Sequence, residues 1–557
     1  MNSILLVLTM VPGADPAPPL AADLVLVGGK VWTVDREHPE AEAVAIWRDR
    51  IVKVGTSAEI SALVGKKTQI IDLKGRRVVP GFHDSHLHFL GGGEQLARVE
   101  LKDAKDEAEF GRRLQVFDKK LPKDRWMLGG NWDHDRTFLG NLPTAAIVDK
   151  YVPDRPVFIR RYDGHMALAN SAALRMAKVT AETKEPAGGV IFKLADEKTP
   201  SGILKDNAMG LVDRVIPPPD ETEIADGIRA AMRACAENGL TSVQDMDGSP
   251  AEIRRVLARS LQKLARDGQM TVRLDLHWPI ASRNEVIGAG AEANFGNDFF
   301  RIGSVKGFMD GSLGSSTARM FEPYEAGGKN VGVFVTPPDA MAGMIREADK
   351  AGLSIAVHAI GDEANATLLD IFADAAKANG PRDRRFRIEH VQHLRPADYK
   401  RFKEIGVVAS MQPYHAIDDG RWAEGRIGPR RCASSYAFRS FIDNGARLAF
   451  GSDWPVAPLD VLAGIDAAVN RRTLDGKHAD GWFPEQRITV AEAVEAYTLG
   501  SAYGAFQDGD RGSIRAGNLA DMVILSRDIL ASGERDKIAD TRVETTIVGG
   551  RVVFERK

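Results

Sequence analysis

The sequence predicts an α/β protein: a (β/α)8 TIM barrel with an insertion after its first strand, plus a small β-sandwich domain built from both chain ends. Three observations predict this fold class. Eight short apolar segments alternate with amphipathic helix patterns. A long stretch after the first of these segments breaks the alternation. Strand-rich segments stand at both ends of the chain, and neither is long enough to bury a core alone.

The composition is typical of a soluble globular protein with more than one domain. The chain has 557 residues, of which 44% are hydrophobic and 27% charged, and a formal net charge of −3. This charge balance gives no reason to expect nucleic acid or a membrane surface as a partner. The two cysteines, Cys235 and Cys432, form neither a metal motif nor a disulfide framework.

Residues 1–22 differ in composition from the rest of the chain. Residues 1–11 are mostly apolar, and residues 12–22 are rich in Pro and Ala. This pattern resembles a secretory signal peptide, but the apolar core is short, no Lys or Arg precedes it and the cleavage site is poor. The alternative is a disordered tail on a cytoplasmic enzyme. We favour export, periplasmic or secreted, over the cytoplasmic alternative, and no other segment is suited to span a bilayer.

The two ends of the chain are predicted to fold together. Short β-rich runs near the start lie at residues 23–27, 30–34, 43–46 and 50–54, with Gly28-Gly29 as a hairpin turn signal. Runs near the end lie at residues 521–525, 545–548 and 551–554, the last two separated by Gly549-Gly550. We expect residues 23–80 and 508–557 to form one composite β-sandwich domain.

Residues 81–507 are predicted to form the barrel. Its strands are expected to start at Phe82 and to follow at residues 241–244, 272–276, 302–308, 354–358, 386–390, 407–411 and 447–451. Amphipathic helices fall between them, for example at residues 340–351, 363–378 and 396–405. Glycines stand where such helices are expected to end: Gly352, Gly380, Gly406 and Gly445.

Residues 92–220 interrupt this alternation and show few clean strand patterns. We therefore interpret them as an insertion after the first barrel strand. Loops at the carboxyl end of barrel strands build the active site, so we expect the insertion to form part of the substrate pocket or its lid. Aromatic side chains such as Trp132 are candidates for the pocket wall, although core packing is the commoner role of such residues.

Candidate metal ligands stand where the predicted strands end. His86 and His88 are two residues apart, so on a strand their imidazoles point to the same side and can bind one metal ion. His358, His390 and Asp453 each follow a later apolar strand. One such residue alone would be undistinguished, since an Asp at a strand end is more often a helix cap. Together they predict a metal site at the carboxyl face of the barrel.

Lys306 lies inside a predicted strand, where a buried ammonium is costly unless it is paired or neutralised. One interpretation is a salt bridge between Lys306 and Asp310. The other is reaction of the amine with carbon dioxide, which gives an anionic carbamate that can bridge two metal ions. The sequence leaves both open.

Seven segments together carry a family resemblance: Pro80–His88, Asp163–His165, Val305–Ala318, Val357–Asp362, Arg387–His390, Ser410–Pro413 and Phe450–Asp453. The chain resembles the amidohydrolase superfamily from about residue 23 to 554, and within it the amidohydrolase-3, or YtcJ-like, group. The resemblance implies a metal-dependent hydrolase that acts on carbon–nitrogen bonds other than peptide bonds in small molecules. It also implies Zn2+ as the metal, with two ions expected and other divalent metals as alternatives.

The resemblance implies a role for each candidate ligand. His86 and His88 would bind the first metal, and His358 and His390 the second. Carboxylated Lys306 would bridge the two ions. Asp453 would bind the first metal, accept a proton from the attacking water as general base and deliver it to the leaving nitrogen. We expect an N-acyl or N-formyl substrate.

Other residues near these motifs are candidates for further roles. His165 either contacts the oxyanion or substrate, as a second catalytic residue, or is a turn histidine. His83 would point away from the metal pair and is predicted to be structural. Gln412, His415 and Trp454 lie just beyond strand ends and are further candidates for the pocket wall, and His393 is a candidate helix cap.

Two alternative functions use the same barrel. A mononuclear deaminase of this superfamily usually carries a Glu three residues after the fifth-strand His and lacks the strand Lys. Here that position is Gly361 and Lys306 is present, which disfavours a deaminase. A non-catalytic binding or regulatory protein should have lost ligands, whereas all six candidates are present. A homo-oligomer is an alternative to a monomer.

Overall fold

The computed structural model describes residues 21–96, 98–161, 166–186, 189–246, 248–314, 316–325 and 328–557. Residues 1–20, most of the predicted signal peptide or tail, lie outside the described residues. Within the described ranges, no helix has the length and hydropathy needed to cross a membrane. Contacts divide the chain into two compact units, the first made of Met1–Leu87, Cys235–Gly248 and Thr271–Lys557, the second of His88–Ala234 and Ser249–Met270.

The first unit contains the barrel. Eight strands pair side by side, each parallel to its neighbour, in the order β8 (Phe82–Leu87), β15 (Leu240–Asp245), β16 (Arg273–Pro279), β18 (Phe300–Phe308), β19 (Ser354–Ala359), β20 (Arg387–His390), β21 (Val408–Met411) and β22 (Arg447–Phe450). After β22 the chain returns to β8, where the backbone N–H of Asp453 donates to the carbonyl oxygen of His86 at 2.7 Å. The ring is thus nearly closed, and the predicted TIM barrel is confirmed.

The barrel strands are connected by helices, and a short strand β17 (Phe295–Gly296) pairs antiparallel with β18. The helices of the first unit after residue 271 are α10 (Arg283–Gly288), α11 (Pro338–Lys350), α12 (Asp362–Asn379), α13 (Tyr399–Ile405), α14 (Pro413–Asp419), α15 (Ala423–Cys432), α16 (Phe438–Asp443), α17 (Val461–Asn470), α18 (Val490–Glu495) and α19 (Ser501–Gly504). α11, α12, α13 and α16 end one or two residues before the predicted stop glycines. Gly406, for example, follows α13 with φ 77°, the left-handed conformation that ends a helix.

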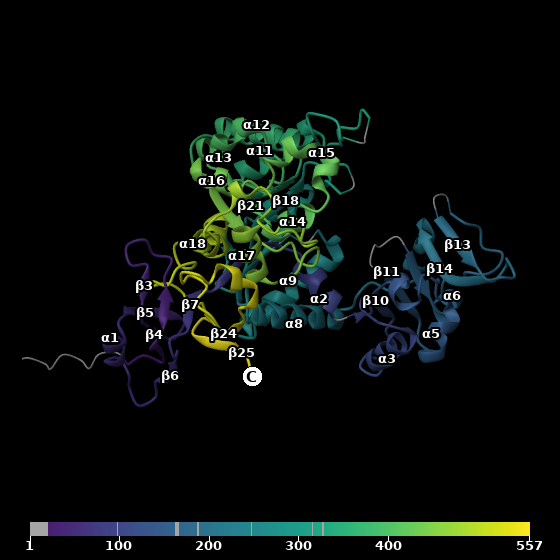
Figure 1. Cartoon of the computed structure of the whole chain (residues 1–557), viewed down its shortest axis with the longest axis horizontal. Helices are drawn as coiled ribbons and strands as arrows, with labels where there is room; N and C mark the ends of the chain where they lie inside the picture. The colour runs from purple at the N-terminus through teal and green to yellow at the C-terminus, as the bar shows by residue number, and fades with distance from the viewer. Residues whose placement is uncertain are drawn as a thin grey trace, which may run out of the picture. The chain divides into compact units, whose positions relative to one another are not determined.

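Two further sheets of the first unit come from the ends of the chain. One has the order β5 (Arg50–Gly55), β4 (Ala43–Trp47), β1 (Leu24–Val27), β6 (Gln69–Asp72), with α1 (Ser57–Ser61) nearby in the sequence. The other has the order β25 (Arg551–Glu555), β24 (Val543–Val548), β23 (Met522–Leu525), β7 (Arg77–Pro80), β2 (Lys30–Trp32), β3 (Glu40–Ala41). Figure 1 shows β7 close to β24 and β25, although they stand at opposite ends of the sequence. One buried cluster draws on both ends, with Leu26 and Val31 beside Ile524 and Ile547.

The hairpin predicted at Gly28-Gly29 is wrong. β1 pairs with β4 and β6, whereas β2 pairs with β3 and β7, so the two glycines carry the chain from one terminal sheet to the other. A Gly pair signals a tight change of direction, but the neighbouring strands decide whether the two flanking segments then pair. At Gly549-Gly550 they do, and β24 and β25 form an antiparallel hairpin.

A single glycine connects a terminal sheet to the barrel. β7 ends at Pro80 and β8 begins at Phe82, and a Cβ atom at Gly81 would lie 2.2 Å from the Oγ1 atom of Thr241. No larger residue fits without a shift of β15. β7 is fixed on one side by β2 and on the other by β23, so the first barrel strand emerges directly from a strand held by both chain ends.

The second unit has more regular structure than the sequence predicted for the insertion. It contains a six-stranded sheet in the order β13 (Gly189–Lys193), β14 (Pro200–Asp206), β12 (Met166–Ala169), β11 (Val157–Arg161), β10 (Met127–Trp132), β9 (Val99–Glu100). Two buried clusters include Trp132 and Phe158. Its helices are α2 (Phe89–Leu96), α3 (Glu107–Asp118), α4 (His134–Thr137), α5 (Ala145–Tyr151), α6 (Ser171–Met176), α7 (Gly210–Asp213), α9 (Ala251–Arg266) and most of α8 (Glu221–Glu237).

Candidate metal centre

The predicted ligands stand at or just beyond the carboxyl ends of barrel strands. His86 is on β8 and His88 follows it, Lys306 is on β18, His358 is on β19 and His390 is the last residue of β20. Asp453 comes three residues after β22. His390 and Asp453 have φ values of 75° and 61°, a left-handed backbone conformation that is uncommon for residues with a side chain and is often found at functional sites.

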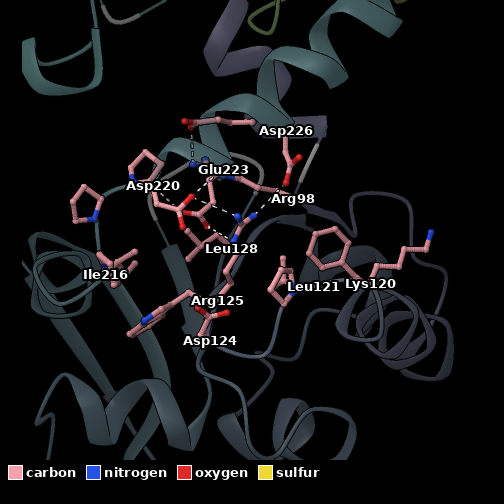
Figure 2. Close-up of a pocket in the computed structure, with 17 residues that line it drawn as sticks. Arg98, Lys120, Leu121, Asp124, Arg125, Leu128, Ile216, Asp220, Glu223 and Asp226 are labelled. Carbon is pink, nitrogen blue, oxygen red and sulfur yellow. Dashed lines mark hydrogen bonds and ion pairs between the residues drawn. The ribbon is translucent and has the colours of Figure 1, made fainter. Parts of the chain in front are cut away.

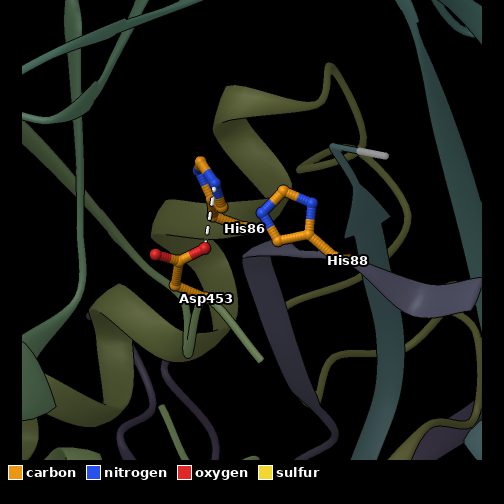
Figure 3. Close-up of side chains that lie close together, drawn as sticks. All are labelled: His86, His88 and Asp453. Atoms are coloured by element: carbon orange, nitrogen blue, oxygen red, sulfur yellow. Dashed lines mark ion pairs between the residues drawn. The ribbon is translucent and has the colours of Figure 1, made fainter. Parts of the chain in front are cut away.

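Three of these side chains form one group that could hold a metal ion. The group consists of His86, His88 and Asp453, each of which offers one ligand atom, and these three atoms lie within 4.8 Å of one another. Figure 3 shows the three side chains close together. Oδ1 of Asp453 lies 3.5 Å from Nε2 of His86. The group includes two imidazoles and one carboxylate, all donors of the kind that zinc binds.

His86 is oriented by a buried carboxylate. Its Nδ1 atom lies 2.7 Å from Oε2 of Glu389, and the other oxygen of Glu389 lies 2.8 Å from the guanidinium of Arg387. All three side chains are at most 1% exposed. With Nδ1 engaged, Nε2 is the nitrogen that faces Asp453. Metal-binding histidines commonly have a carboxylate on the far nitrogen, which sets the ring orientation and tautomer.

His358 and His390 lie next to this group without belonging to it. Their ring centroids are 4.5 Å apart, and that of His390 is 4.7 Å from the ring of His86. Nδ1 of His390 lies 2.8 Å from Oε1 of Gln412, and Nε2 of His358 lies 2.9 Å from the carbonyl oxygen of Gly311. Burial lowers the pKa of His358 to about 4 and the pKa of His390 well below its usual value. Both rings are thus neutral at pH 7, the form that binds metals.

Lys306 lies in the same cluster. Its side chain is buried, with Nζ 3.4 Å from Nε2 of His86 and 4.8 Å from the ring centroid of Phe308. Burial lowers the pKa of the amine to about 8. Among the described residues no ion pair joins Lys306 to Asp310. The carboxylate of Asp310 instead accepts backbone N–H groups from Ile360, Gly361 and Arg319 at 2.8–3.0 Å.

The structure places the other candidates as follows. His165 lies outside the described residues. His83 is buried with Nε2 3.1 Å from Nε2 of Gln244, and Nδ1 of His393 lies 2.6 Å from Oγ of Ser435. Trp132 is in the core of the second unit, and Trp454 is buried directly after Asp453.

His415 approaches Asp453. Its Nε2 atom lies 3.2 Å from Oδ2 of the carboxylate. Burial alone would lower the pKa of His415, but the hydrogen-bonding and charge interactions with Asp453 raise it overall. The sequence predicts His415 as a residue of the pocket wall and predicts no role for Glu389. A His two residues after a strand-end Gln-Pro, and a Glu directly before a strand-end His, are the signals that could have singled them out.

A cavity of about 510 Å³ lies within the second unit and contains none of the predicted ligands (Figure 2). Trp126 and Leu128 line part of it. Arg125 approaches three carboxylates of or next to α8, those of Asp220, Glu223 and Asp226, at 3.4–3.5 Å. All three carboxylates are partly exposed and paired with one guanidinium, so this cluster is a surface ion network.

The donor set around β8 and β22 fits a divalent metal ion. Two histidines and a carboxylate leave a coordination position open, as in catalytic zinc sites. Glu389 supplies the outer partner of a ligand histidine. Two further neutral imidazoles and a buried amine adjoin the group. This arrangement can bind and activate water, and the nearby carboxylate of Asp453 can accept a proton from it.

Comparisons with known proteins agree on one family. The sequence profile of the Amidohydrolase family matches residues 69–554. Protein LONG AFTER FAR-RED 3 of Arabidopsis thaliana is 37% identical over 97% of this chain and 93% of the relative. Putative amidohydrolase YtcJ of Bacillus subtilis is 30% identical over 95% of this chain and 99% of the relative. N-substituted formamide deformylase of Arthrobacter pascens is 26% identical over 96% of this chain and 98% of the relative. The crystal structure of an uncharacterized metal-dependent hydrolase from Pyrococcus furiosus is 30% identical, with a TM-score of 0.75, over 91% of this chain and 100% of the other.

Proposed function

The chain belongs to the amidohydrolase family, and on this premise we propose that it hydrolyses an amide-type C–N bond, N-acyl or N-formyl, of a small molecule. The convergence of His86, His88 and Asp453 at the ends of two barrel strands is the observation that carries this proposal. A relative named N-substituted formamide deformylase, 26% identical, supports the choice of bond.

We assign the predicted ligands to two zinc ions. His86, His88 and Asp453 would hold the first, and His358 and His390 would hold the second. A carbamate on Lys306 would supply an anionic ligand beside them. The carbamate forms when the neutral amine of Lys306 attacks carbon dioxide and releases one proton, and the position of Nζ beside His86 supports this role. When bound, a metal ion lowers the pKa of water and so supplies hydroxide near neutral pH.

The residues of the chain then handle the proton and the charge. Asp453 accepts the proton of the attacking water at a carboxylate oxygen and later delivers it to the leaving nitrogen, so that the amine departs neutral. Glu389 keeps Nε2 of His86 directed at the ligand group through the 2.7 Å contact to Nδ1. His165 contacts the oxyanion or the substrate in this proposal. The neutral imidazoles of His358 and His390 add no positive charge that would repel a cation.

The test is hydrolysis of a substrate panel by the purified, zinc-loaded chain. The panel contains N-acyl amino acids, N-formyl amines, cyclic amides and esters, with release of carboxylic acid or formate as the readout. We expect turnover of at least one amide-type class, loss of that turnover with a chelator, and restoration by zinc. Asp453→Asn should lose turnover.

The alternatives give other results. A mononuclear deaminase would release ammonia from an amino-substituted ring and hold one metal ion per chain. A binding or regulatory protein on the same barrel would hold metal, or none, without turnover of any panel member. Metal content together with the identity of the released product therefore separates the three functions.

A further inference from the structure

The two oxygens of the Asp453 carboxylate face different histidines. Oδ1 lies 3.5 Å from Nε2 of His86, and Oδ2 lies 3.2 Å from Nε2 of His415. The side chains of Asp453 and His415 are only 8% and 12% exposed. His415 is not one of the six predicted ligands, and its ring centroid is 6.4 Å from that of His390. His415 therefore contacts the metal group only through Oδ2 of Asp453, while Oδ1 of the same carboxylate faces His86.

The local fold holds His415 in this position. α14 begins directly after β21, with Gln412 as the N-cap and Pro413 as the first helical residue. His415 is the third residue of this helix, so its backbone is fixed by the barrel strand before it. Asp419, one turn further along the same helix, is also buried and accepts a hydrogen bond from the Tyr436 hydroxyl at 2.5 Å. The charges of two buried carboxylates thus act on His415, and Asp453 is the one it contacts through Nε2.

The backbone of Asp453 does not by itself fix its carboxylate. The N–H of Asp453 donates to the carbonyl oxygen of His86 at 2.7 Å, which fixes the Cα position. The last torsion of an Asp side chain is broad, so a second contact is needed to fix the plane of the carboxylate. The contact to His415 is suited to this, because it engages the oxygen that is not directed at His86.

We propose that His415 is a positioning residue for Asp453. Its Nε2 atom, 3.2 Å from Oδ2, holds that oxygen by a polar contact and keeps Oδ1 directed toward His86 and His88, in the orientation that ligation and proton acceptance both need. This inference deepens the proposed function and rests on it. It gives α14 a part in the metal centre without a ligand of its own.

The test compares two variants of nearly equal shape. His415→Gln retains an N–H donor at about the reach of Nε2, whereas His415→Met has similar length and no such donor. The control is His393→Met, which removes another buried histidine that lies 2.6 Å from Ser435. Each protein is stripped of metal and titrated with Co2+, whose visible absorption reports the ligand geometry, and kcat and KM are then measured with a substrate from the panel.

We expect His415→Met to bind Co2+ about 10- to 100-fold more weakly with an altered absorption spectrum, and to lose kcat with a smaller change in KM. His415→Gln should bind Co2+ within a few-fold of the unmodified protein and with its spectrum. His393→Met should keep the Co2+ affinity and the absorption spectrum of the unmodified protein. Co2+ affinity and spectrum unchanged in His415→Met would overturn the inference while leaving the proposed function intact. Equal losses in His415→Gln and His415→Met would also overturn it. Failure of the unmodified chain to bind Co2+ would overturn the proposed function and this inference together.

Discussion

Replacing Glu389 with Gln tests both contacts of this buried carboxylate, one with His86 and one with Arg387. Glu389 accepts from His86 at one oxygen and pairs with Arg387 at the other, at 2.7 and 2.8 Å. Gln has the same shape but no charge, and it offers only one oxygen for the two donors. The change therefore removes the charge partner of a fully buried guanidinium and weakens the contact that orients His86.

The size of each effect follows from burial. Removing one partner of a buried ion pair costs about 3–5 kcal/mol of folding free energy. Arg387 also donates to the carbonyl oxygen of Ser85 at 2.7 Å and to the hydroxyl of Ser410 at 3.2 Å, so we expect a value near the lower end, about 3 kcal/mol. Loss of the outer partner of a ligand histidine weakens metal binding about 10- to 100-fold, which corresponds to about 1.4–2.8 kcal/mol.

Two measurements test these values: urea unfolding of the metal-free protein, and zinc affinity by competition with a chelator. The matched control is Glu495→Gln, because Glu495 forms a 3.3 Å ion pair with Arg36, whose side chain is 83% exposed. A surface pair of this kind contributes at most about 1 kcal/mol. A Glu389→Gln protein with unchanged zinc affinity and a urea midpoint equal to that of the control would refute the reasoning.

Three further predictions concern single residues. His88→Ala should lower the metal content and abolish turnover, because it removes one of three converging donors, and full metal occupancy measured by elemental analysis would contradict this. Lys306→Arg should lose at least the second metal, because a guanidinium cannot form the carbamate; two metal ions per chain with near-normal turnover would rule the carbamate out. Asp521→Leu should lower the free energy of unfolding in urea by about 3–5 kcal/mol, because the buried guanidinium of Arg273 loses its charge partner. In the unmodified protein Arg273 binds Asp521 through two hydrogen bonds of 2.7 and 2.9 Å. An unchanged urea midpoint would show that this pair does not stabilise the fold.

The barrel could be predicted because its signals are local. Each strand is a short apolar run, and helices such as α13 end at a glycine that the sequence marks. The six-stranded sheet of the second unit could not be predicted in the same way. Its strand β10 contains Gly129, Gly130 and Asn131, all with positive φ, so the strand shows no regular alternation. The sheet order also skips a strand, because β12 pairs with β14, and single-strand patterns do not encode such a pairing.

The candidate ligands could be predicted from their places at strand ends, but the contacts that orient them could not. Glu389 and His86 are 303 residues apart, and their 2.7 Å contact arises only when β8 and β20 face each other across the barrel. The left-handed backbone at His390 and Asp453 likewise depends on tertiary structure, since most residues of both types have negative φ even though Asp and His adopt positive φ more often than other residues with a side chain. Sequence patterns thus predict which side chains lie at the strand ends, whereas the tertiary structure decides which atom of each side chain contacts which partner.

The junction at Gly81 has a consequence for how the protein is made. β8, which carries His86, continues from β7, and β7 is completed as a sheet strand only by β23 near the carboxyl end. A ribosome synthesises β8 well before β23. Until β23 has been made, the metal-binding strand therefore lacks one of the two partners that fix its base, and the nascent chain depends on long-range pairing to finish the site. A chain that stops before β23 carries every predicted ligand and yet leaves the first barrel strand held on one side.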